Sequence, residues 1–112
     1  MKILALEKES PGVTAGQIQP LLKEEARCVW ALQQSGLIRE IYFEAGRHTS
    51  VLMLECADSE AARHALAALP LVRAGLIEFE LVPLVPYDGF ARLFESSHLS
   101  TIDGEASHEP NI

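Results

Sequence analysis

Three side chains in this sequence could move a proton near neutral pH. His48 stands beside Arg47, directly before a predicted strand, and histidine changes its charge near neutral pH with little tuning. Glu7 and Glu55 stand at the C-terminal ends of two predicted strands. If these strands are parallel neighbours, the carboxylates lie close together and their repulsion raises the pKa of one of them. The alternative is that His48 is a solvated turn residue and that each glutamate marks where its strand meets solvent.

Two arginines and two aromatic residues could hold a substrate. Arg39 lies in a predicted strand that is otherwise half-buried, and Arg73 lies just after a Leu-Pro-Leu segment. A guanidinium offers a carboxylate two parallel hydrogen bonds. Trp30 and Tyr42 could line a pocket, and Tyr42 could donate a hydrogen bond to a developing enolate. The structural alternatives are that Arg73 caps a turn and that both aromatic residues belong to the core or to an interface.

The sequence lacks the motifs of metal, cofactor and nucleophile chemistry. None of its four histidines has a metal-ligand spacing such as His-x-x-x-His, and Cys28 and Cys56 form no Cys-x-x-Cys pair. There is no glycine-rich phosphate loop and no Gly-x-Ser-x-Gly elbow. We therefore expect neither a cofactor nor a metal. Both cysteines are expected to be small buried hydrophobic residues without a disulfide.

Length and composition favour one small domain in the cytoplasm. The chain has 112 residues, of which 48% are hydrophobic, enough for a real core. Its net charge is -7 and its nine basic residues are scattered, which disfavours nucleic acid because phosphates bind clustered Lys and Arg. No stretch approaches the ~20 apolar residues that span a bilayer, so no membrane partner is expected. The short apolar start, which ends at Glu7, does not fit a signal peptide.

The periodicity of apolar residues predicts the elements that position these side chains. Apolar residues recur at helical spacing over 20–35 and 59–69, and Gly36 and Pro70 end the two helices. Alternating or wholly apolar runs predict four strands, at 2–7, 37–44, 50–56 and 76–84. The predicted order is therefore β-α-β-β-α-β.

This order predicts a ferredoxin-like α+β fold. One four-stranded antiparallel sheet carries both helices on a single face, and right-handed crossovers place the first and third strands side by side in its middle. The other face stays bare. A second copy of the chain is expected to cover it, giving a two-fold homodimer whose sheets close into a barrel. The residues expected on the bare face are Ile3, Ala5, Tyr42, Val51, Met53 and Val82.

The single domain is expected to span residues 1–94. Its last part, 88–94, carries two aromatic residues and a leucine, and it is expected either to pack on the domain or to reach over the partner. Residues 95–112 have few apolar anchors and are predicted to form a flexible tail.

Three segments resemble a known family. The first predicted helix ends in Ala31-Leu32-Gln33-Gln34-Ser35-Gly36, similar to the family's Glu-Leu-Gln-x-Gln-Gly, and the third strand begins in Thr49-Ser50-Val51-Leu52. The most specific segment is Ala68-Leu69-Pro70-Leu71, a strand, and Val82-Pro83-Leu84, where the family has Gly-Leu-Pro-Leu, a strand, and Thr-Pro-Leu. On these segments the chain resembles the muconolactone isomerase-like family of the dimeric α+β barrel superfamily, which also holds the YciI-like proteins.

The resemblance implies a proton shift on an unsaturated lactone, without a cofactor, in an assembly built from dimers. The chain departs from the family in three places. Leu22-Lys23-Glu24-Glu25 matches only roughly a helix turn in which the family has a basic residue, and Glu25 is the cleanest correspondence. Val72-Arg73-Ala74-Gly75 replaces an aromatic residue after Leu-Pro-Leu, and the extension beyond Pro86 differs.

The expected function is therefore that of a cofactor-free isomerase acting on a small anionic lactone or carboxylate. His48 or a Glu7–Glu55 pair would transfer the proton, and Arg39 would hold the carboxylate. Two alternatives stay open. One is a non-catalytic dimeric barrel that binds a small ligand or serves in assembly, and the other is a cofactor-independent monooxygenase with an apolar pocket for an aromatic substrate. This fold hosts many functions, so the fold alone does not separate them.

Overall fold

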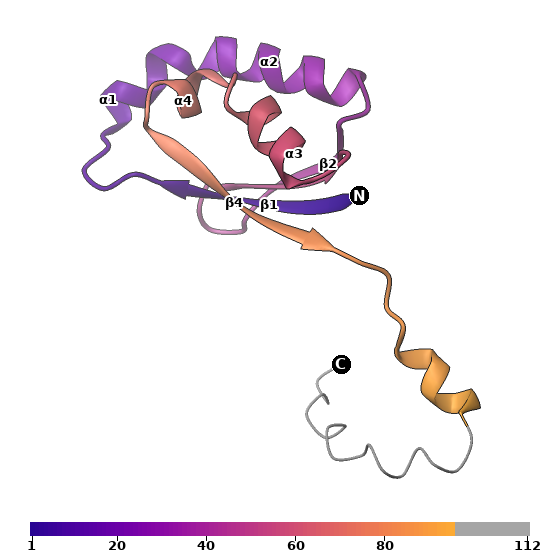
Figure 1. Ribbon diagram of the computed structural model, residues 1–112. Helices are drawn as coiled ribbons and strands as arrows, with labels where there is room; N and C mark the ends of the chain where they lie inside the picture. Colours follow the sequence, from indigo (N-terminus) through magenta and orange to yellow (C-terminus); the bar gives the residue numbers. More distant parts are fainter. Residues whose placement is uncertain (96–112) are drawn as a thin grey trace.

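The computed structural model describes residues 1–95 and has the expected β-α-β-β-α-β order (Figure 1). The strands are β1 (Lys2–Glu9), β2 (Ile38–Phe43), β3 (Ser50–Glu55) and β4 (Ile77–Leu84). The helices are α1 (Ala15–Ile18), η1 (Gln19–Leu21), α2 (Leu22–Gln34), α3 (Ser59–Leu66), α4 (Pro70–Arg73) and η2 (Gly89–Phe94), of which η1 and η2 are 3-10 helices. None of these helices is long and apolar enough to cross a membrane.

The four strands form one antiparallel sheet in the order β2-β3-β1-β4, and α1 to α4 cover one face of it (Figure 1). This confirms the predicted ferredoxin-like architecture with β1 and β3 in the middle. The core lies between the sheet and the helices. Its buried members are Ile3, Ala5, Ile38, Leu52, Leu54, Ala62, Leu66 and Leu69.

The direction of β3 overturns the expectation that Glu7 and Glu55 are neighbours. The helical crossover makes β2 run in the same direction as β1, and the short connection at 44–49 then reverses the chain, so β3 runs antiparallel to β1. Lys2 pairs with Glu55 and Leu6 pairs with Val51. Glu7 and Glu55 therefore lie at opposite ends of the central strand pair.

The side of the sheet that each residue of β1 faces differs from a second expectation. Ile3 and Ala5 are fully buried beneath the helices and do not face the bare side of the sheet. Leu4 and Leu6 take that side instead, because alternate residues of a strand point to opposite faces. The pairings confirm the rest of the predicted set. The bare face, as the term is used below, consists of Leu4, Leu6, Tyr42, Val51, Met53, Val82 and Leu84.

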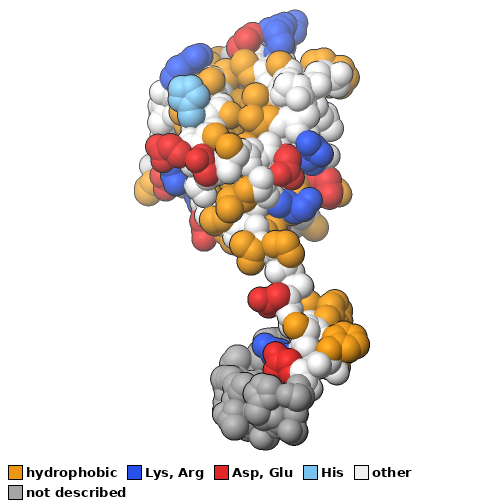
Figure 2. Space-filling view, turned by 45° about the vertical axis from the view of Figure 1, so that its right-hand side comes forward, with side chains coloured by type: hydrophobic (Ala, Val, Ile, Leu, Met, Phe, Trp, Pro, Cys, Tyr) orange, Lys and Arg blue, Asp and Glu red, His pale blue; other side chains and the backbone are white. Residues whose placement is uncertain are grey.

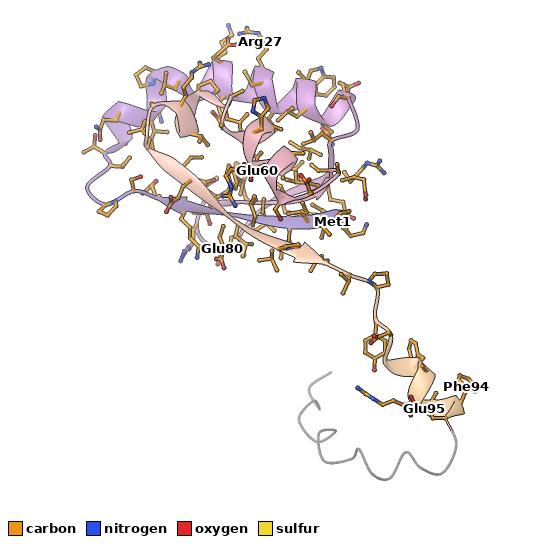
Figure 3. The ribbon with its side chains drawn as sticks, viewed as in Figure 1. Met1, Arg27, Glu60, Glu80, Phe94 and Glu95 are labelled. Carbon is orange, nitrogen blue, oxygen red and sulfur yellow. The ribbon has the colours of Figure 1, made fainter. Side chains whose placement is uncertain are left out.

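The chain beyond β4 leaves the body of the domain. Residues 85–94, here called the C-terminal arm, extend away from the sheet, and Phe94 and Glu95 lie at its far end (Figures 1 and 3). Its large apolar side chains are exposed, namely Val85, Tyr87, Phe90, Leu93 and Phe94. The structure thus does not place this segment on its own domain, and reaching over a partner is the alternative that stays open. The rest of the predicted tail, 96–112, lies outside the described residues.

Both cysteines are free thiols, and they are half-buried, less than the full burial expected. Burial raises the pKa of the Cys28 thiol, and the neighbouring charge of Glu24 raises it further. Burial likewise raises the pKa of the Cys56 thiol. A raised pKa keeps a thiol protonated and unreactive, so neither cysteine is a nucleophile candidate.

Asp58 begins α3 as its N-cap. Its side chain accepts a hydrogen bond of 2.8 Å from the backbone N–H of Ala61, one of the amides that a helix start leaves unpaired. We expect Asp58→Ala to lower the free energy of unfolding by about 1 kcal/mol, measured by urea denaturation. Asp58→Asn is the matched control. It keeps the acceptor oxygen and should change the free energy of unfolding by only about a few tenths of a kcal/mol. Equal losses in both variants would contradict the capping role.

Candidate active site

Glu7 is a carboxylate held between the sheet and the helices. It follows Ile3 and Ala5 at two-residue spacing on β1, so it points to the helix-covered face, and it is half-buried. Its Oε1 accepts two hydrogen bonds from the first residue of β3, from Ser50 N at 2.7 Å and from Ser50 Oγ at 2.8 Å. Its other oxygen has no hydrogen-bond donor among residues 1–95. This arrangement fixes the carboxylate and leaves one oxygen available for chemistry.

Glu25 is the second carboxylate of this site. It shares the core-facing stripe of α2 with Cys28, Val29 and Leu32 at helical spacing. Its Oε1 accepts a hydrogen bond of 2.9 Å from the backbone N–H of Leu71 in the first turn of α4. Burial raises the pKa of Glu25, the Leu71 hydrogen bond opposes this, and the negative charge of Glu7 raises it further. The fold therefore favours the protonated form of Glu25 more than water does.

Glu7 and Glu25 replace the expected Glu7–Glu55 pair. The two carboxyls come from β1 and α2. Glu25 binds Leu71, which packs in one cluster with Phe79, the cross-strand partner of Glu7, and the charge of Glu7 is the smallest of the effects on the pKa of Glu25. A perturbed carboxyl beside a second, fixed carboxylate is the arrangement that separates an acid from a base. The sequence contained one signal for Glu25, a charged residue within the apolar stripe of a helix, where ionisable side chains are rare.

His48 lies at the same end of the sheet as this pair. It belongs to the exposed connection between β2 and β3, and its ring meets the ring of Phe43 edge to face at 4.9 Å between centroids. Phe43 pairs in register with Ser50, which binds Glu7. Ile41 and Phe43 are on the helix-facing side of β2 yet remain exposed, at 37% and 64%. His48 and the exposed apolar side chains of Ile41 and Phe43 on β2 therefore lie on the β2 side of Glu7.

Three other predicted site residues lie elsewhere, around the bare face. Glu55 Oε2 is 2.8 Å from the amino group of Met1. That hydrogen bond lowers the pKa of Glu55, and the positive charge of Arg39 adds to the effect. A bulge between Ile38 and Glu40 interrupts β2 at Arg39, whose Nε donates to the carbonyl of Gly36 at 2.6 Å. Arg39 thus lies at the same end of the sheet as Glu55, without an ion pair between them among residues 1–95, and at the opposite end from His48.

Tyr42 is also on the bare face. Its hydroxyl donates a hydrogen bond of 2.9 Å to Glu40, and this bond raises the pKa of the Tyr42 phenol. A phenol already committed to a carboxylate is a weaker donor for an enolate than a free one. Its 59% exposure and its pairing with Val51 fit the interface alternative.

Arg73 and Trp30 belong to the helix layer. Arg73 ends α4, and its positive charge acts on Cys28 of α2, where it partly offsets the effects of burial and Glu24 that raise the thiol pKa. Arg73 is thus a cation where α2 packs against α4. The hydrogen bond from Leu71 N–H to Glu25 joins the same two helices. Trp30 lies on α2 with 62% of its surface exposed.

Neither Glu7 nor Glu25 lines either of two hollows on the surface of residues 1–95, although Phe79, which lines the smaller hollow, pairs in register with Glu7. A cavity of about 120 Å³ lies between α3 and β4, and its walls include Leu66, Phe79 and Leu81. It is smaller than the roughly 300 Å³ at which ligand pockets begin. A wider depression beside α3 is open and lined by Asp58, Glu60 and His64. None of the seven predicted site residues lines either hollow, so we locate the candidate site by its carboxyl chemistry.

Within residues 1–95 no three His, Cys, Asp or Glu side chains are grouped to hold a metal ion. The chemistry that the described residues do offer is proton transfer, from Glu7 and Glu25 with His48 nearby.

Glu25 should make stability depend on pH in a defined direction. Because its pKa is raised on folding, the folded chain holds more protons than the unfolded chain between the ordinary glutamate pKa and the raised one. Stability therefore falls as pH rises through that interval. Glu25→Gln keeps an acceptor for Leu71 N–H and removes the charge, so the difference in unfolding free energy between variant and wild type should grow across the interval. Urea denaturation at a series of pH values checks this, and a pH-independent difference would contradict it.

Comparisons with known proteins agree on the fold. No family model matches the chain, and no curated protein matches it in sequence. The solved structure of muconolactone isomerase is 20% identical, covering 79% of this chain and 92% of its own, with a TM-score of 0.65. That of 5-chloro-2-hydroxyhydroquinone dehydrochlorinase from Burkholderia phenoliruptrix AC1100, in complex with 2,5-dihydroxybenzoquinone, is 18% identical, covering 80% and 98%, with a TM-score of 0.56. The chain has the fold of these enzymes, and the match supports the resemblance carried by the three sequence segments.

Proposed function

We propose that this chain is a cofactor-free isomerase that shifts a proton on a small anionic lactone or carboxylate. The observation that carries the proposal is the Glu7–Glu25 pair, one carboxylate fixed by Ser50 and one carboxyl biased toward its protonated form. The shared fold with a lactone isomerase and a dehydrochlorinase raises the expectation of such an activity but does not by itself assign it.

In the proposed reaction, Glu7 is the base and Glu25 is the acid. Glu7 takes a proton from the carbon beside the carbonyl, and the electron pair of that C–H bond forms an enolate. Glu25 gives its proton to the far carbon of the conjugated system, which moves the double bond and leaves the composition of the substrate unchanged. The proton on Glu7 then returns to Glu25, whose burial favours its protonated form.

The remaining candidate residues take binding roles in this proposal. Arg73 holds the substrate carboxylate from the seam of α2 and α4, and Trp30 supplies an apolar wall on the helix side. His48 exchanges protons with solvent at the outer rim. Arg39, Tyr42 and Glu55 lie at the bare face, where they would meet a second copy at the dimer seam.

The test is turnover in deuterium oxide. The chain would be incubated with muconolactone, related unsaturated lactones and hydroxyquinones, and the products followed by proton NMR. We expect isomerisation of at least one lactone, with deuterium appearing at the carbon that receives the proton, because the carboxyls exchange with solvent between turnovers. Binding of a lactone by calorimetry without any turnover would instead favour the non-catalytic barrel, the alternative that the separation of Arg39 from His48 supports.

We also infer that a second copy of this chain covers the bare face. That face has an apolar centre, in which Leu4 pairs with both Met53 and Val82, and charged residues at its rim, such as Lys8 and Glu80. An apolar centre with a polar rim is the pattern of an interface, and a two-fold axis lets one surface cover itself.

A further inference from the structure

A row of four side chains crosses the whole sheet at the level of Glu7. Phe79 of β4 pairs in register with Glu7 of β1. On the other side of Glu7, Ser50 of β3 binds its carboxylate and pairs in register with Phe43 of β2. All four residues belong to the helix-facing side, because cross-strand neighbours share one face of a sheet. The proposed base therefore lies in one row with two aromatic residues, next to Phe79 and one strand away from Phe43.

The fold closes one half of this row and leaves the other half open. Phe79 is half-buried and packs against both buried clusters of the core. Phe43, in contrast, is 64% exposed, and Ile41 on the same side of β2 is exposed as well. The ring of His48 meets Phe43 edge to face, which holds the Phe43 ring without covering it. A substrate therefore reaches Glu7 from the β2 side, passing Phe43 and Ser50.

The spacing of the strands leaves room for one substrate ring on this path. Neighbouring strands lie about 4.8 Å apart, so the backbones at Phe43 and Glu7 are roughly 10 Å apart, with Ser50 between them. Ser50 is small, and its hydroxyl is committed to Glu7. Two aromatic rings in contact have centroids about 4.5–7 Å apart, so a ring that contacts Phe43 lies over Ser50. There it meets the oxygen of Glu7 that Ser50 does not bind.

We propose that Phe43 is a specificity-determining residue, which selects substrates with a planar, unsaturated ring. The substrate ring lies over Ser50 and meets the Phe43 ring in an offset-stacked or edge-to-face contact. Such a contact adds binding free energy beyond the burial of apolar area, and a puckered saturated ring of similar size does not form it. The inference rests on the proposed function, because it places the reacting ring beside Glu7. It narrows the substrate class to small anionic compounds whose ring is flat.

Two probes of equal charge and similar size test the proposal by binding alone. Benzoate has a flat ring, and cyclohexanecarboxylate has a puckered, saturated one. Their dissociation constants would be measured by NMR titration of the backbone amides in the wild type, Phe43→Leu and Phe43→Tyr. The amide of Ser50, which donates to Glu7 at 2.7 Å, reports on a ligand beside Glu7. The amide spectra also check that each variant is folded.

Phe90→Leu is the matched control, because it is the same substitution at a ring that is 68% exposed. Phe90 belongs to the C-terminal arm, whose apolar side chains gather apart from the body (Figure 2). The arm also leaves the sheet at Leu84, level with Lys2 and at the opposite end from Phe43. This variant should bind both probes as the wild type does.

We expect the wild type to bind benzoate about 2–10-fold more tightly than cyclohexanecarboxylate. Phe43→Leu should lose this preference through weaker binding of benzoate, and Phe43→Tyr, which keeps the ring, should retain it. Equal affinities in the wild type, an unchanged preference in Phe43→Leu, an equal loss for both probes, or no binding of either probe would each overturn the proposal. These outcomes leave the isomerase reaction to the turnover experiment. Conversely, an intact preference without turnover of any lactone would remove the reaction and keep the selection of flat rings by Phe43.

Discussion

Replacing Glu25 by glutamine is expected to lower the turnover of a lactone substrate by about 10²–10⁴-fold, the usual effect of losing a general acid. Glutamine has the same shape and still accepts the hydrogen bond of Leu71 N–H, but it has no proton to give. The variant should be no less stable than the wild type at neutral pH, because the raised pKa of Glu25 means that its charge costs stability in the fold. The measurements are single-turnover kinetics and urea denaturation on the same samples.

Neighbouring substitutions make this result specific. Glu24→Gln is the matched control, since Glu24 is exposed and pairs with Arg27 on the outer side of α2. It should leave turnover unchanged. Glu7→Gln should lose activity to a similar extent as Glu25→Gln, because it keeps an acceptor for Ser50 but can no longer take a proton. In the wild type, kcat/KM should fall as pH rises through the raised pKa of Glu25. Full activity in Glu25→Gln would falsify its role as the acid.

Replacing Leu4 by aspartate is expected to separate the dimer, with a dissociation constant about 10²–10³-fold higher than that of the wild type. Leu4 lies at the centre of the bare face, between Met53 of β3 and Val82 of β4. A two-fold interface would bury the new carboxylate twice among apolar side chains, where an unpaired charge is strongly unfavourable. Sedimentation velocity over a dilution series measures the change.

The matched control for this prediction is Lys2→Gln. Lys2 lies on the same strand and the same side of the sheet as Leu4, but at its exposed end, paired with Glu55 and Leu84. Rim charges contribute little to affinity, so the constant should hardly change. If Leu4→Asp stays dimeric at the concentrations where the wild type does, the second copy is seated on another surface.

The order of elements was predictable from the sequence because each one has a local cause. Gly36 follows the end of α2, and alternating apolar residues form the strands. Pro70 was expected to end the second helix, but α3 already ends at Leu66 and Pro70 begins α4, because proline suits the first turn of a helix. No local feature decides which residues of β1 face the helices. Ile3-Leu4-Ala5-Leu6 is apolar at every position, so alternation does not say which side chains face the helices. Pairing with β3 and β4 decides that Ile3 and Ala5 are buried.

The candidate site was predictable only in part. Glu7 and His48 were identified as residue types fit for proton transfer, and both lie at one end of the sheet. The partner of Glu7 was assigned wrongly, because the expected proximity of Glu55 needed parallel strands and the hairpin at 44–49 makes them antiparallel. Glu25 takes that place because α2 turns its apolar stripe onto the sheet.

By itself, the sequence determined the β-α-β-β-α-β order, the antiparallel sheet with one bare face and the supply of acid, base and arginine side chains. These follow from local periodicity, helix ends and the short connections that limit how strands can pair. Only the tertiary structure decided which glutamates are neighbours, which face each residue of β1 occupies and that the C-terminal arm leaves its own domain. Those features depend on strand direction, register and burial, which arise between segments far apart in the chain.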